Sequence, residues 1–219
     1  MGSKRDLLQL VDPVFPPRRG FLRGERIRER LETSLSGRVF SDLEKPFLAV
    51  ATEFATLDRV VLRTGNVASA IVASLAVPGV VVPVRRDGVE YIDGGVCDPL
   101  PVNLARSHWD LDLVIGVNVL PPVGSLRKRN SVSGETHFLK RPARFLSRHL
   151  NYFSYGNLLD ILRAAAMGSQ MRLVGKSARE ADVLVSPMSP KSGWYDYHRY
   201  ADYIRIGRKA AEDSLTEIQ

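Results

Sequence analysis

The spacing of hydrophobic residues changes several times along the chain, and each change marks an expected element. From Gly24 to Leu35 apolar residues recur at helical spacing among charges, which predicts an amphipathic helix. The segment 66–76 is small and apolar on every side, as in a buried helix packed closely on a sheet. In all, the pattern predicts helices at residues 24–35, 66–76, 102–108, 155–174 and 197–215.

Short apolar runs predict the strands, at residues 46–52, 59–63, 80–84, 89–92, 112–119 and 181–185. The nearly continuous run 46–52 is typical of a strand buried on both faces. Asp87-Gly88 lies between two such runs and predicts a hairpin. The run 112–119 is the clearest strand and suits the centre of a parallel sheet. Helices alternating with buried strands predict a layered α/β fold.

Composition narrows the class of protein. A chain of 219 residues with 44% hydrophobic and 25% charged residues is typical of one globular domain. No apolar run approaches the roughly 20 residues that span a bilayer, and no signal peptide is recognisable. Cys97 is the only cysteine, so we expect a reducing, cytoplasmic setting. The four histidines share no metal-ligand spacing, and we expect neither metal nor cofactor.

Most of the net charge of +7 lies in one segment. Residues 125–150 contain one acid, Glu135, and seven cations: Arg127, Lys128, Arg129, Lys140, Arg141, Arg144 and Arg148. This segment therefore carries +6 of the net charge, which leaves +1 for the rest of the chain. Residues 121–142 lack sustained periodicity and are interpreted as a mobile basic loop. Such a loop is either simply solvated or attracted to anionic lipid, at ~1 kcal/mol per cation near the surface, as in peripheral membrane contact. RNA binding is the weaker reading, since no RNA-binding motif accompanies the charge, and no nucleic-acid partner is expected.

The acid at position 93 is the main candidate for chemistry. Asp93 ends the second arm of the predicted hairpin and is followed by Gly94-Gly95, which permits a sharp exit from the sheet. Functional groups collect in loops at strand ends of α/β sheets. An Asp-Gly pair is also common in plain turns. The local pattern alone therefore leaves both a turn-capping and a catalytic role open.

The segments 70–84 and 91–102 together closely resemble the patatin-like phospholipase family, through a small-residue helix ending in Pro78-Gly79 and the motif Asp93-Gly94-Gly95. Residues 18–25, 47–53, 181–185 and 196–210 are also similar to family segments. The resemblance implies a three-layer α/β/α fold with a largely parallel central sheet. It further implies an acyl-ester hydrolase with a serine–aspartate dyad, in which Asp93 is the catalytic base and a lipid or acyl ester is the substrate.

Two other elements of that family do not appear in these residues. No segment reads Gly-x-Ser-x-Gly, the strained turn that presents a nucleophilic serine, and no glycine-rich oxyanion loop is present. We therefore expect a partial patatin-like domain over 1–219 that lacks its N-terminal part, holds Asp93 without a nucleophile and is inactive alone. The alternative is a non-catalytic protein of the same fold that binds a lipid surface or a partner. Unpaired sheet edges of such a chain predict self-association.

Overall fold

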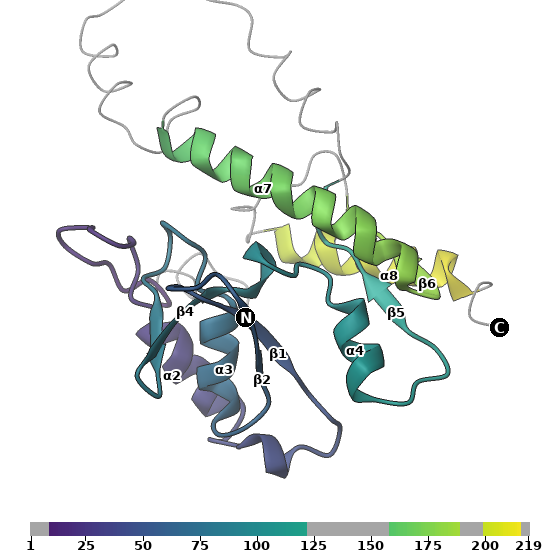
Figure 1. Cartoon of the computed structure of the whole chain (residues 1–219), viewed down its shortest axis with the longest axis horizontal. Helices are drawn as coiled ribbons and strands as arrows, with labels where there is room; N and C mark the ends of the chain where they lie inside the picture. Colours follow the sequence, from purple (N-terminus) through teal and green to yellow (C-terminus); the bar gives the residue numbers. More distant parts are fainter. Residues whose placement is uncertain (1–8, 122–157, 189–198, 216–219) are drawn as a thin grey trace, which may run out of the picture. The chain divides into compact units, whose positions relative to one another are not determined.

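The computed structural model describes residues 9–121, 158–188 and 199–215. The chain divides into two compact units, Met1–Pro101 with Asp196–Tyr200, and Val102–Tyr195 with Ala201–Gln219 (Figure 1). The predicted basic loop at 121–142 falls almost entirely outside the described residues, and so do all seven cations counted between residues 125 and 150. Among the helices that the structure describes, none has the length and apolar character needed to cross a bilayer.

The first unit is built on a four-stranded sheet in the order β2-β1-β4-β3. Its strands are β1 (Ala49–Glu53), β2 (Arg59–Leu62), β3 (Val84–Arg86) and β4 (Val89–Asp93). All three strand pairs are antiparallel, so the prediction of a largely parallel central sheet is wrong for this sheet. Short connections explain two of these pairs, the β1–β2 and β3–β4 hairpins, because parallel neighbours require a long crossover. The third pair, β1–β4, is antiparallel although β2, α3 and β3 lie between the two strands in the sequence. The apolar run at β1 correctly indicated burial, but burial does not fix the direction of a neighbouring strand.

Two helices complete the first unit, and both confirm the sequence pattern. Helix α3 (Val67–Ser74) begins at Asn66, whose side chain accepts a hydrogen bond from the Ser69 amide at 2.8 Å. Its small residues allow close packing against β1 and β4, and α2 (Glu25–Ser34) packs on α3. The core between helix and sheet consists of Ala49, Ala51, Leu62, Ala70, Ala73 and Tyr91. A 3-10 turn, η1 (Phe40–Asp42), contributes Phe40 to the edge of this core.

The second unit contains helices α4 (Val102–His108), α7 (Leu158–Ser177) and α8 (Tyr200–Asp213), with a 3-10 turn η3 (Ala178–Glu180). Its strands β5 (Ile115–Val117) and β6 (Val183–Val185) pair in parallel. The strand predicted at 112–119 is confirmed only at residues 115–117, where it pairs in parallel, and its predicted place at the centre of a sheet is wrong for the described residues. Strand β5 has three residues, and Ile115 and Val117 are 46% and 51% exposed. Within the described residues β5 has β6 as its one strand neighbour, so an apolar sequence here does not produce a buried strand.

Candidate active site

A tight hairpin carries Asp93 to its position. The turn between β3 and β4 places Asp87 and Gly88 at positive φ, 51° and 84°, the geometry that the Asp-Gly pair predicts. Strand β4 then runs beside β1, with Asp93 opposite Ala51. Because the pair is antiparallel, the end of β4 lies next to the beginning of β1. The residues around position 50 therefore border the exit of the chain at Asp93.

The backbone of Asp93 is held on both sides. Its amide donates to the carbonyl of Ala76, just beyond α3, at 3.0 Å. Its carbonyl accepts a hydrogen bond from the Thr52 hydroxyl at 2.9 Å. Thr52 is completely buried (0% exposed), so this hydroxyl bond links the core of β1 directly to Asp93. Buried, fully partnered groups of this kind fix the position from which the carboxylate projects.

The two glycines after Asp93 have different structural roles: Gly94 allows close approach to β1, and Gly95 binds the Asp93 carboxylate. The 3-10 turn η2 (Gly94–Val96) begins at once, and a Cβ placed on Gly94 would lie 2.0 Å from the Val50 carbonyl oxygen. Gly94 is therefore required by close backbone approach, and neither glycine is among those with positive φ. The Gly95 amide donates to Oδ1 of Asp93 at 2.6 Å. This short bond orients the carboxylate.

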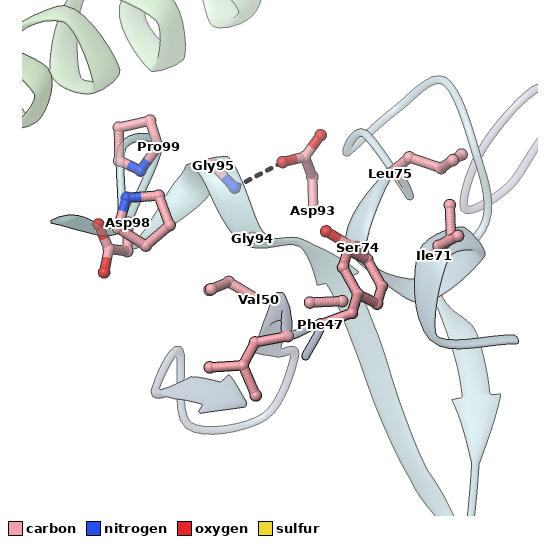
Figure 2. Close-up of a pocket in the computed structure, with 13 residues that line it drawn as sticks. Phe47, Val50, Ile71, Ser74, Leu75, Asp93, Gly94, Gly95, Asp98 and Pro99 are labelled. Atoms are coloured by element: carbon pink, nitrogen blue, oxygen red, sulfur yellow. Dashed lines mark hydrogen bonds between the residues drawn. The ribbon is translucent and has the colours of Figure 1, made fainter. Parts of the chain in front are cut away.

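The Asp93 side chain faces a hollow of about 410 Å³ on the first unit (Figure 2). In the figure, Ile71 and Leu75 lie on one side of the carboxylate, and Asp98 and Pro99 on the other. Phe47 completes the apolar side. Pockets of roughly 300–1,000 Å³ with mainly apolar walls and few polar groups are typical small-molecule sites. The hollow thus combines one oriented acid with an apolar wall.

Burial raises the pKa of Asp93 above its ordinary value, and the Gly95 hydrogen bond offsets part of that rise. Among the described residues, the Gly95 amide is the only donor to this carboxylate, so Oδ2 is left without such a bond. A carboxylate with a raised pKa and one uncommitted oxygen is a stronger proton acceptor than an ordinary aspartate. Its geometry is compatible with general-base chemistry.

The neighbouring acid and thiol are committed to other contacts. Asp98 forms an ion pair with Arg59 of β2 at 2.6 Å, which ties the turn to the sheet rather than to Asp93. Cys97 is half-buried, with its Sγ 3.1 Å from the Thr52 hydroxyl and 3.4 Å from the Gly94 carbonyl. In the described part of the chain no three histidine, cysteine or acidic residues gather as a metal site would require.

Sequence reasoning missed the wall of the hollow. Phe47, Ile71, Ser74 and Leu75 were predicted only as parts of a strand and a helix. The missing signal is the antiparallel direction of β4 against β1, which brings the segment before β1 to the same hollow as Asp93. Ser74 shares the hollow with Asp93, yet no hydrogen bond joins the two described side chains, so this serine does not form a dyad with Asp93.

Comparison with known proteins places this geometry in context. An uncharacterised NTE family protein of Mycobacterium tuberculosis is 34% identical over 117 residues, which is 53% of this chain and 32% of that protein. A protein of the same description from Mycobacterium bovis gives the same values. A second NTE family protein of Mycobacterium tuberculosis is 24% identical over 98% of this chain and 37% of its own length. The chain thus spans about a third of the length of these relatives. Residues 11–106, which contain Asp93 and every residue of its hollow, match the family described as patatin-like phospholipase.

Proposed function

We propose that this chain carries the aspartate half of a patatin-like serine acyl hydrolase that cleaves lipid or other acyl esters. The observation that carries the proposal is the placement of Asp93 in an apolar-walled hollow, with one oxygen held by Gly95 and the pKa raised by burial. The family match over residues 11–106 and the similarity to NTE family proteins support the same assignment.

In the proposed reaction, Asp93 accepts the hydroxyl proton of a serine while the serine oxygen attacks the ester carbonyl. The proton then passes to the departing alcohol, which leaves an acyl group bound to the serine. In the second half, Asp93 accepts a proton from water as the water oxygen attacks this acyl group, and the proton returns to the serine oxygen as the carboxylic acid is released. A general base of this kind contributes roughly 10²–10⁴-fold to the rate. Burial supports this role because it makes the carboxylate more basic without changing its orientation.

The nucleophile has to come from polypeptide outside these 219 residues, because no Gly-x-Ser-x-Gly occurs in them. Without that serine the covalent route is closed, and the chain alone is expected to hydrolyse no short p-nitrophenyl ester. Measurable turnover that disappears on Asp93→Ala would contradict this part of the proposal.

The decisive experiment labels serine with a fluorophosphonate in two proteins, this chain and a version extended through the upstream reading frame. We expect labelling of the extended protein only, and a loss of its labelling rate of about 10²-fold or more in Asp93→Asn. Asp98→Asn is the matched control, because it removes the same charge from the same hollow but from the ion pair with Arg59. Equal labelling rates in the Asp93→Asn and Asp98→Asn proteins would overturn the general-base role.

The alternative is a non-catalytic module of the same fold that binds a lipid surface or a protein partner. It is favoured by one observation: none of the described serines is hydrogen-bonded to Asp93. Peripheral contact would come from the cationic segment 127–148, whose structure is not described. Co-sedimentation with vesicles tests it, and equal binding to neutral and anionic vesicles would remove the electrostatic argument.

A further inference from the structure

A loop of the first unit, residues 14–21, carries an aromatic side chain into solvent. Phe15 in this loop is 95% exposed, although phenylalanine is among the residue types most often buried in proteins. Figure 1 shows the loop as a purple trace that projects from the first unit. A single exposed apolar residue needs no explanation by itself, but three further features of this loop favour one use of it.

The first feature is a loop base that is firmly held. The Val14 amide donates to the Phe21 carbonyl at 2.9 Å, which closes the loop. The Arg19 guanidinium donates to both carboxylate oxygens of Glu90 in β4, at 2.8 and 2.7 Å, which ties the loop to the sheet. Because its base is fixed, the loop presents Phe15 with less loss of conformational freedom on binding than a loose segment would suffer.

The second feature is a backbone with few hydrogen-bond donors at the tip. Pro16 and Pro17 follow Phe15 directly, and proline has no backbone N–H group. A backbone amide that leaves water without finding a new partner costs free energy. A tip that lacks two of these amides therefore leaves water at a lower cost than an ordinary loop.

The third feature is positive charge beside the aromatic ring. Residues 13–23 contain three arginines and no acid. Arg19 is neutralised by Glu90, whereas Arg18 and Arg23 are exposed and, within the described residues, take part in no ion pair. The preceding acid, Asp12, accepts hydrogen bonds from two amides at the start of α2. The two unpaired cations are thus available to an anionic partner.

We propose that this loop is a membrane anchor, in which Phe15 enters the interface of a phospholipid bilayer while Arg18 and Arg23 contact lipid phosphate groups. An apolar side chain combined with cations is the composition that binds anionic membrane surfaces. A protein partner is less favoured, because a stable interface buries about 800 Å² on each side over roughly 20–30 residues, and the tip offers one aromatic residue. The anchor is separate from the hollow at Asp93 and does not depend on the proposed hydrolase.

The test measures binding of the whole chain to vesicles of equal parts phosphatidylcholine and phosphatidylglycerol by co-sedimentation. Phe15→Ala is expected to weaken binding about tenfold, through the lost burial of an aromatic side chain. Ile161→Ala is the matched control, because Ile161 is 58% exposed on α7 in the other unit, and it is expected to change little. All variants keep the cationic segment 127–148, so differences between them belong to the substituted side chain.

Charge and insertion are then separated by salt and by depth. Arg18→Ala is expected to weaken binding about fivefold at low ionic strength, and salt should reduce this effect but not that of Phe15→Ala. Phe15→Trp is expected to add fluorescence, relative to the parent protein, that is quenched by vesicles with brominated acyl chains.

Three results would overturn the inference: equal binding of Phe15→Ala and the parent protein, equal losses in Phe15→Ala and Ile161→Ala, or no added quenching in Phe15→Trp. The first result would assign vesicle binding to another surface and leave the tip for a protein partner. None of these measurements needs a serine nucleophile. Failure of the anchor would therefore leave the role of Asp93 untouched, and failure of the fluorophosphonate experiment would leave the anchor.

Discussion

Gly94→Ala tests whether close backbone contact holds the acid in place. The added methyl carbon would lie 2.0 Å from the Val50 carbonyl oxygen and 2.5 Å from the carbonyl carbon. A normal carbon–oxygen contact is roughly 3.3 Å or more, so β4 and β1 would have to separate by about 1 Å at this point. Both contact atoms belong to the backbone of a buried strand, which cannot rotate away.

The expected cost is therefore at the upper end of overpacking, about 3 kcal/mol. For a chain of this length that lowers the melting temperature by roughly 6–12 °C, measured by circular dichroism. Gly168→Ala is the control, because its added methyl meets no atom within 4 Å and lies inside helix α7. It is expected to leave stability unchanged or to raise it by up to ~1 kcal/mol. A Gly94→Ala melting temperature within about 2 °C of the parent protein would refute the close-contact argument.

Two further substitutions probe how Asp93 is held. Asp93→Asn keeps a side-chain oxygen that accepts from the Gly95 amide and removes a charge that burial disfavours. Because burial raises the pKa of Asp93 in the folded protein, the free energy of unfolding at pH 7 is expected to increase. The gain is expected to disappear as the pH falls below the ordinary carboxyl pKa, where the aspartate is protonated in both states. Equal urea midpoints at pH 7 would contradict it. Thr52→Val nearly preserves the side-chain volume and removes the hydroxyl group that donates to the Asp93 carbonyl. It is expected to lower the free energy of unfolding, measured with urea, by about 1–3 kcal/mol, because a buried carbonyl loses this hydrogen bond. Thr33→Val, at an exposed helical hydroxyl, serves as its control and should change little.

The local elements could be predicted because their signals are local. The small-residue helix at α3, the Asp-Gly hairpin and helix α4 follow from periodicity and turn chemistry within a few residues. The position of Asp93 at the end of a strand followed for the same reason.

The direction of the sheet could not be predicted in the same way. A continuous apolar run reports burial, and β1 is indeed buried along four of its five residues. Whether its neighbours run parallel or antiparallel depends on connections elsewhere in the chain. Because of that error the sequence did not indicate that Phe47 and Asp93 line one hollow, since only the antiparallel register brings the beginning of β1 to the end of β4. At β5 the error was opposite: an apolar run predicted burial that the fold does not supply.

The surroundings of Asp93 also define where an incoming serine would have to meet it. Oδ1 is engaged by Gly95 and the backbone by Ala76 and Thr52, so the proton would pass to Oδ2 on the side of the hollow. Asp93→Glu keeps the charge but adds a methylene, which displaces the carboxylate by about 1.5 Å from a fixed backbone. Misplacement of about 1 Å can lower the rate about 10²-fold, so the extended protein carrying Asp93→Glu is expected to lose fluorophosphonate labelling to that extent. Full labelling of the glutamate protein would mean that charge alone, rather than the position fixed by Gly94 and Gly95, is what the site requires.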